Sequence, residues 1–266
     1  MAHVPYWDVL NETARRVGDA ATAQAGLRSN SARAALRAML GGAPGAPDAL
    51  LGAPVFEPAS VWRSEGDTIG GLEGNLLDPA LVKALDAARG DARVPRDRLL
   101  YTHQIAAWRA ALEGERRSFA VTSGTGSGKT ECFMIPILHD LIAAPTRPGG
   151  AVRAIMLYPL NALIESQRRR LGAWLEGFGG KLRYGLYKGD MPENAPAATR
   201  PPAWETADRQ SLRARPPDIL VTNITMLEFM MVRPQDQQIL ARSQGALRWI
   251  VIDEAHSYAG AQAAEI

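Results

Sequence analysis

The sequence predicts an α/β protein, in which a mainly parallel sheet is covered by helices on both faces and a mainly helical N-terminal region precedes it. After Arg98, short apolar runs alternate with helical patterns. Strands that are connected through helices run parallel within one sheet. Residues 1–40 are rich in alanine, leucine and arginine, with few helix breakers. We therefore expect two domains, residues 1–98 and residues 99–266.

The N-terminal region is divided by a connector rich in proline and glycine, residues 41–58. A later helix is indicated by Asp78, a suitable N-cap, followed by Pro79 at the first helical position. This helix should end near Gly90. The apolar residues expected on one of its faces are Leu81, Val82, Leu85 and Ala88. The sequence assigns no function to residues 1–98, which we interpret as an accessory region packed on the rest.

The C-terminal region should contain the sheet. The predicted strands cover residues 118–122, 152–158, 181–187, 218–222 and 248–252. The helices of this region are expected to begin near Thr102, Gly128, Leu160, Thr225 and Ala255. Ligands of such sheets bind beyond the carboxyl ends of the strands. The functional residues should therefore follow directly after strands.

Composition excludes several classes of protein. The 266 residues allow a sizeable core, and 46% apolar with 22% charged residues excludes general disorder. The net charge of +2 does not by itself mark a nucleic-acid binder, and the single cysteine, Cys132, cannot form an internal disulfide. No apolar run approaches the roughly 20 residues that span a bilayer. Residues 1–16 lack the pattern of a secretory signal. We expect a cytoplasmic enzyme or binding protein with no membrane partner.

A glycine-rich segment follows the first predicted strand and departs from the phosphate-binding pattern G-x-x-x-x-G-K-[ST] only at Ser123, which replaces the first glycine. Glycines let backbone N–H groups converge on phosphate oxygens, and the next helix directs its positive end toward them. The expected triphosphate-binding residues are Gly124, Thr125, Gly126, Ser127, Gly128, Lys129 and Thr130. Lys129 should reach the β- and γ-phosphates, and the Thr130 hydroxyl should hold Mg²⁺. A chance glycine-rich turn is disfavoured by the strand before it and the complete G-K-T ending.

Two carboxylates, Asp253 and Glu254, follow the last predicted strand. A carboxylate at the end of a buried strand is costly unless it meets a cation. We expect Asp253 to bind the Mg²⁺ held by Thr130, and Glu254 to orient and deprotonate the attacking water. Acidic residues also favour the first turn of a helix, and that interpretation is compatible with this one.

The glycine-rich segment and the sequence DEAH at residues 253–256 together resemble the superfamily 2 helicases of the DEAD/DEAH-box class. Other segments are similar to further motifs of that family: LYTHQ at residues 100–104 to the Q motif, YPLNAL at 158–163 to motif Ia, and VTNITML at 221–227 to motif Ib. The sequence DEAHSYAG is similar to large bacterial DNA helicases of the Lhr and YprA/MrfA type, and helicases of phage-defence systems share it. The resemblance covers about residues 99–266.

This resemblance implies a RecA-like domain that binds ATP and Mg²⁺. It implies that Gln104 reads the adenine edge and that His256 couples the nucleotide site to domain movement. It also implies contacts to the phosphates of a nucleic acid, with DNA favoured, from Asn161, Thr222, Asn223 and Thr225. For each of these four residues, helix capping is the alternative interpretation.

The resemblance further implies the ATP-binding half of a helicase, because motifs III to VI and the second RecA-like domain of the family are not among these residues. We expect the N-terminal part of a longer motor, with that second domain as partner, and weak ATP binding with very slow hydrolysis by this part alone. One alternative is an ATP-dependent translocase subunit of a restriction or phage-defence complex, without strand separation. Another is a non-catalytic nucleotide-dependent binding module, disfavoured by the intact Lys129, Thr130, Asp253 and Glu254. GTPases and transporter ATPases are disfavoured because N-K-x-D and L-S-G-G-Q segments are absent.

Overall fold

The computed structural model describes residues 6–47, 49–55, 62–114, 118–124, 126–195 and 201–258. The chain forms two compact units, Met1–Val61 and Trp62–Ile266. Among the described residues, no helix combines the length and the apolar character required to cross a bilayer.

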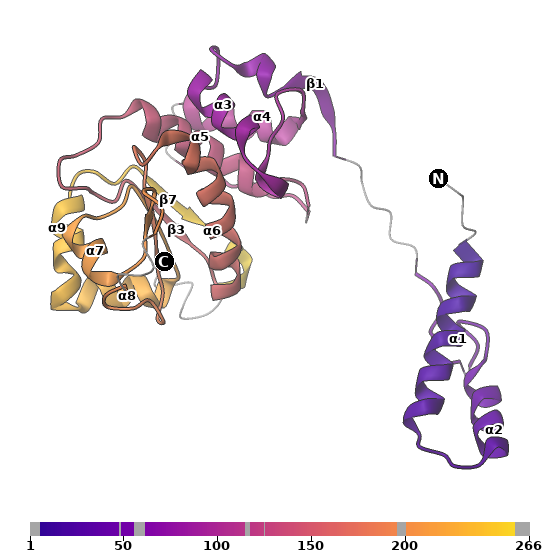
Figure 1. The fold of residues 1–266 in the computed structure, drawn as a ribbon. Coiled ribbons are helices and arrows are strands. Elements are labelled where there is room, and N and C mark those ends of the chain that lie inside the picture. Colours follow the sequence, from indigo (N-terminus) through magenta and orange to yellow (C-terminus); the bar gives the residue numbers. More distant parts are fainter. Residues whose placement is uncertain are drawn as a thin grey trace. The chain divides into compact units, whose positions relative to one another are not determined.

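The first unit contains two neighbouring helices, α1 (Tyr6–Gln24) and α2 (Asn30–Leu40), as predicted for residues 1–40 (Figure 1). Helix α2 begins after Ser29, whose side chain accepts a hydrogen bond from the amide of Ala32. An ion pair of 2.5 Å between Arg37 and Asp19 joins the two helices. The described part of the connector, residues 41–47 and 49–55, contains neither helix nor strand.

The second unit begins with a short antiparallel pair of strands, β1 (Ser64–Thr68) and β2 (Leu99–Tyr101), with the 3₁₀ turns η1 (Gly70–Leu72) and η2 (Gly90–Ala92) between them. Helix α3 (Pro79–Ala87) starts at the predicted cap, because the Asp78 side chain accepts a hydrogen bond from the amide of Ala80. The predicted apolar face of this helix is buried in the main core: Leu81, Val82, Leu85 and Ala88.

The compact units therefore divide the chain at residue 61, whereas the predicted domains divide it at residue 98. Residues 62–98 pack with the sheet-containing unit through specific contacts. The indole Nε1 of Trp174 donates to the carbonyl of Ala92 at 2.7 Å, and the amide of Asp78 donates to His139 Nδ1 at 3.0 Å. The division into functional domains at residue 98 stays a prediction.

The main sheet has five strands in the order β5-β4-β6-β3-β7, and every adjacent pair is parallel. Its strands are β3 (Ala154–Leu157), β4 (Tyr184–Tyr187), β5 (Glu205–Thr206), β6 (Ile219–Thr222) and β7 (Trp249–Ile252). Four of them lie within predicted strands, and the two-residue β5 was not predicted. The parallel sheet of the predicted α/β fold class is confirmed.

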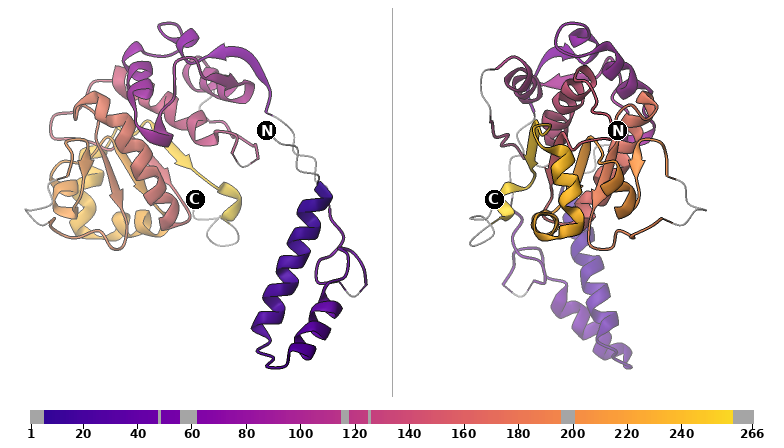
Figure 2. Two further views of the ribbon diagram at one scale, coloured as in Figure 1. Left: turned by 45° about the vertical axis from the view of Figure 1, so that its right-hand side comes forward. Right: turned by 90° about the vertical axis from the view of Figure 1, so that its left-hand side faces the viewer.

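Helices cover both faces of this sheet, as predicted (Figure 2). Successive residues of a strand point to opposite faces. In β3, Ala154 and Met156 pack with helices α5 (Lys129–Ala143) and α6 (Asn161–Leu175). On the opposite face, Leu220 of β6 packs with the shorter helices α7 (Arg209–Ala214), α8 (Ile224–Val232) and α9 (Gln237–Ser243). The 3₁₀ turns η3 (Glu176–Phe178) and η4 (Pro234–Asp236) follow α6 and α8.

One predicted strand is wrong: residues 118–122 form no strand. Among the described residues, β7 is an edge strand that pairs with β3, and its Ile250 side chain is 62% exposed. The run around Phe119 is apolar enough for a strand, but a strand also needs a neighbour that completes its backbone hydrogen bonds. Without that ladder the segment lies outside the sheet. The helix expected near Ala255 is a short 3₁₀ turn, η5 (Ala255–Ser257).

Candidate nucleotide and nucleic-acid site

The glycine-rich segment forms a curled loop that ends at the start of α5. Gly126 and Gly128 both have φ of +76°, a left-handed conformation that glycine adopts without strain, and Gly128 is the N-cap of the helix. The hydroxyls of Ser123 and Ser127 lie 2.6 Å apart and close the loop. Thr125 lies outside the described residues. The loop therefore has the curvature that a phosphate-binding segment requires.

Lys129 directs its ammonium group back into this loop. Its Nζ donates to the carbonyls of Ser123 at 2.7 Å and of Gly124 at 3.1 Å. Thr130 follows as a half-buried residue in the first turn of the 15-residue helix α5. The ammonium group and the positive end of the helix thus lie at the same place, which suits a polyanionic ligand.

The segment that resembles the Q motif connects helix α4 (Thr102–Leu112) to the loop through hydrogen bonds. The Gln104 amide nitrogen donates to the carbonyl of Gly128 at 3.3 Å, and its oxygen accepts from the amide of Tyr101 at 3.1 Å. His103 Nε2 lies 2.8 Å from the carbonyl of Ser127. Gln104 is only 2% exposed, and these two bonds leave one N–H and one lone pair of its amide for a further partner. That role stays a prediction.

Asp253 and Glu254 lie at the carboxyl end of β7, as expected. The amide of Asp253 continues the ladder by donating to the carbonyl of Leu157, and its carboxylate accepts from the amide of Glu254 at 2.9 Å. Burial raises the pKa of Asp253, and the hydrogen bond from the Glu254 amide partly offsets this rise. The Glu254 carboxylate raises this pKa further, and the Lys129 ammonium lowers it. The Lys129 ammonium is thus near enough to act on the pKa of Asp253, although more than 120 residues separate the two along the chain. One joint site made by the two motifs stays a prediction.

Glu254 has a backbone conformation that is unusual for a residue with a side chain. Its φ of +49° is the one positive value among the described non-glycine residues. A left-handed conformation costs roughly 1–2 kcal/mol for such a residue. Residues held in this way cluster at functional sites, because the surrounding structure must hold them in place.

His256 follows on the turn η5 and is the more exposed partner of Glu254. Its side chain is 81% exposed, and Nδ1 lies 3.4 Å from Glu254 Oε2. Both residues line a cavity of about 770 Å³ at the carboxyl ends of the strands. The other residues of this cavity are Pro159, Leu160, Asn161, Leu163, Gly189, Asn223, Ile224, Thr225, Met226, Ser257 and Tyr258.

Three of the four predicted nucleic-acid contacts lie in this cavity. Asn161 and the exposed Thr225 line it, and the Asn223 amide nitrogen donates to the Asn161 side chain oxygen at 3.2 Å. The Asn223 oxygen also accepts from the amide of Met226, which caps α8. The capping alternative therefore holds for Asn223, and the same side chain still reaches the cavity.

Thr222 does not line the cavity, and its contact to a nucleic acid stays a prediction. It is fully buried, and its hydroxyl donates to the carbonyl of Tyr187 at 2.6 Å. As the last residue of β6, it points inward and joins the ends of two neighbouring strands.

Gly189 lines the cavity, but it could not be predicted from residue type, because glycine has no functional side chain. It belongs to the loop of residues 188–191 that follows β4. The general rule that ligands lie beyond the carboxyl ends of parallel strands would have found this loop.

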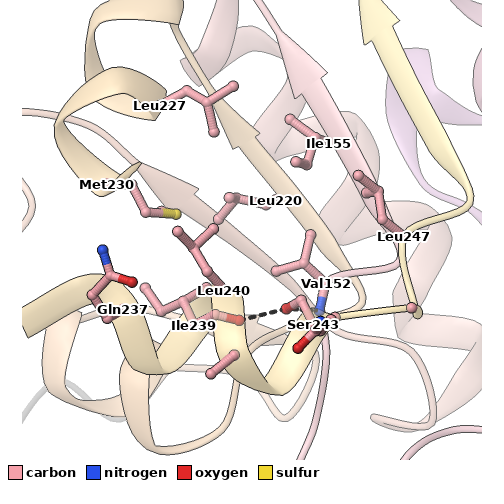
Figure 3. Close-up of a pocket in the computed structure, with 13 residues that line it drawn as sticks. Val152, Ile155, Leu220, Leu227, Met230, Gln237, Ile239, Leu240, Ser243 and Leu247 are labelled. Atoms are coloured by element: carbon pink, nitrogen blue, oxygen red, sulfur yellow. Dashed lines mark hydrogen bonds between the residues drawn. The ribbon is translucent and has the colours of Figure 1, made fainter. Parts of the chain in front are cut away.

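A second cavity lies on the face of the sheet that α8 and α9 cover (Figure 3). It measures about 590 Å³ and is mostly apolar, with Val152, Ile155 and Leu220 on the sheet side. None of the predicted site residues lines it. The chemistry expected from the sequence is therefore concentrated at the loop and the first cavity.

Comparison with protein families tests this interpretation. The model of the DEAD/DEAH box helicase family matches residues 101–266. The chain belongs to the DEAD/DEAH box helicase family. The match begins at the Q-motif segment and includes the glycine-rich loop, the cavity residues and the DEAH sequence, which confirms the resemblance and the RecA-like fold.

Individual relatives agree with this family. The chain is 26% identical to the Druantia protein DruE of Escherichia coli (strain UMEA 4076-1), over 62% of this chain and 14% of that protein. It is 32% identical to the uncharacterized ATP-dependent helicase YprA of Bacillus subtilis (strain 168), over 60% of this chain and 18% of the relative. The crystal structure of the DUF1998 helicase MrfA bound to DNA and AMPPNP matches with a TM-score of 0.50 and 28% identity, over 71% of this chain and 22% of that one. The chain thus spans less than a quarter of the length of each.

Proposed function

We propose that this chain is the ATP-binding half of an ATP-dependent DNA helicase, which hydrolyses ATP when it is joined to a second RecA-like domain. The observation that carries the proposal is one cavity in which Asn161, Asn223 and Thr225 lie together with Glu254 and His256 of the DEAH sequence. The curled loop that holds the Lys129 ammonium at the start of α5 supports it. The crystal structure of MrfA bound to DNA and AMPPNP supports both ligands.

The residues present fit ATP with Mg²⁺. The carbonyls that accept hydrogen bonds from Lys129 belong to the loop itself. Phosphate oxygens can therefore replace them without breaking a contact to another helix or strand. A Cβ at Gly126 would meet no atom of the described residues within 4 Å, so there is space beside this part of the loop, whereas a Cβ at Gly124 would lie 3.0 Å from the ring of Trp62. Thr130 and Asp253 would hold the metal, which would neutralise charge on the phosphates when bound.

In this mechanism, Glu254 acts as the base that orients and deprotonates the attacking water. Its backbone amide donates to Asp253, so the strained residue is fixed relative to the proposed metal ligand. His256 lies beside Glu254 in the cavity, and through this pair we assign it the coupling of the nucleotide site to domain movement.

The proposal is tested on the 266-residue chain by titrating a fluorescent non-hydrolysable ATP analogue and a labelled single-stranded DNA. We expect analogue binding that requires Mg²⁺, and DNA binding that weakens as salt rises. Thr225→Glu should weaken DNA binding about tenfold relative to Thr225→Gln, because a carboxylate in the cavity repels phosphates. Equal DNA affinities of Thr225→Glu and Thr225→Gln would count against the proposal. Analogue binding that is independent of Mg²⁺ would also count against it.

A translocase that does not separate strands would share both sites. The unwinding of a forked duplex by a protein that contains both RecA-like domains distinguishes it from the helicase. Strand separation driven by ATP is the outcome we expect, and ATP hydrolysis without it would favour the translocase.

A further inference from the structure

We infer that Arg209 is a positioning residue for the cavity: it holds the loop of residues 188–191 so that Gly189 stays on the cavity wall. This inference rests on the proposed function, because it assigns the cavity to a nucleic acid. Arg209 itself does not line the cavity and would touch neither ligand.

A single guanidinium group binds three carbonyls of this loop. Arg209 Nε donates to the carbonyl of Met191 at 3.1 Å, and Nη2 donates to those of Lys188 at 3.1 Å and Gly189 at 3.3 Å. The arginine is 9% exposed and begins α7, directly after the capping residue Asp208. Loss of this donor would take a hydrogen bond from all three carbonyls, and the carbonyl of Lys188 would keep only the one that it accepts from the amide of Met191 at 3.1 Å.

The remaining contacts of Arg209 fix the guanidinium itself. Its Nη1 donates to the hydroxyl of Tyr187 at 3.1 Å, and its carbon lies 4.9 Å from the centre of the Tyr187 ring. The Tyr187 hydroxyl in turn donates to the fully buried carboxylate of Asp236, which pairs with Arg213. The loop is therefore connected to a buried network that includes α7 and the start of α9.

The same network reaches the opposite wall of the cavity. Tyr187 is the last residue of β4, and its carbonyl accepts from the Thr222 hydroxyl at the end of β6. The next residue, Asn223, lines the cavity and binds Asn161. Arg209 thus fixes the position of Gly189, on one side of the cavity, relative to Asn161 and Asn223 on the other side. A shift of the loop would change the width of the cavity between them.

Arg153 offers a matched control. It is also buried, and its Nη1 also donates to two carbonyls, those of Leu141 and Ala144. It lies at the opposite end of the strands, where it pairs with Asp218. Its contacts stabilise the fold without reaching the cavity.

The test compares Arg209→Lys with Arg153→Lys in the 266-residue chain. A lysine keeps the charge but lacks the planar set of five donors. We expect Arg209→Lys to weaken the binding of single-stranded DNA about tenfold and to leave the binding of the ATP analogue with Mg²⁺ within twofold. Arg153→Lys should lower the thermal unfolding midpoint at least as much as Arg209→Lys does. It should nevertheless leave the affinity for DNA within twofold of the unaltered chain. Unchanged DNA affinity in Arg209→Lys, or an equal loss in both variants, overturns the positioning role.

If Arg209→Lys does not fold, Gly189 supplies a test that spares the network. A Cβ at Gly189 would meet no atom within 4 Å, so substitution there leaves the fold intact. Gly189→Glu should bind DNA about tenfold more weakly than Gly189→Gln, and equal affinities overturn the inference. An unaltered chain that binds no DNA contradicts the proposed function itself and, with it, the role of Arg209.

Discussion

Replacing Lys129 with alanine is expected to abolish binding of the ATP analogue. The substitution removes the one cation that the structure places inside the described part of the loop. Charge-assisted contacts to phosphate are among the strongest hydrogen bonds, so we expect a loss of about 100-fold or more. The measurement is a titration of the fluorescent analogue in the presence of Mg²⁺.

The matched control for this prediction is Lys181→Ala, because Lys181 is exposed and lies before β4, at the opposite ends of the strands. This variant should bind the analogue like the unaltered chain. Glu254→Gln should also bind it normally, yet stop hydrolysis in a protein that contains both RecA-like domains. If Lys129→Ala and Glu254→Gln lose binding to the same extent, the assignment of separate roles is wrong.

Replacing Gly128 with alanine is expected to damage both the fold and the nucleotide site. Its φ of +76° costs roughly 1–2 kcal/mol for a residue with a Cβ. The added Cβ would also lie 2.3 Å from the amide nitrogen of Gln104 and 3.1 Å from the carboxylate of Glu131. Because Gln104 is buried, it has little room to move away. A fall of several degrees in the thermal unfolding midpoint should accompany the loss of analogue binding.

Gly126→Ala separates the two causes. Gly126 has the same φ of +76°, but a Cβ there meets no atom within 4 Å. It should therefore lose only the stability that the left-handed backbone costs, clearly less than Gly128→Ala. Equal losses in the two variants would mean that the close approach of the new Cβ to Gln104 costs no stability, which contradicts the prediction.

The sequence predicted those features that depend on local spacing. The cap at Asp78 and Pro79 identifies the start of α3, and Gly128 marks the start of α5. The position of Asp253 follows from the end of an apolar run, which is again a local pattern. These local patterns can be recognised without knowing how the rest of the chain folds.

Other features depend on distant neighbours and could not be predicted in this way. Residues 118–122 have the apolar character of a strand, but only the fold determines whether a partner strand is available. The sequence does not show that the hydroxyl of Thr222 donates to the carbonyl of Tyr187, because that partner lies on another strand. Gly189 contributes backbone alone, so only its place after β4 shows its position.

The most direct test of the joint metal site is a double-mutant cycle between Thr130→Val and Asp253→Asn, measured as the Mg²⁺ dependence of analogue binding. The two residues are assigned to one Mg²⁺, so each single variant should remove most of that dependence. The double variant should then bind the analogue almost as well as the single variant that binds it more weakly. The coupling free energy between the two substitutions should be about 1–2 kcal/mol. Losses that simply add, or a single variant that keeps its full response to Mg²⁺, would contradict a metal held by both side chains.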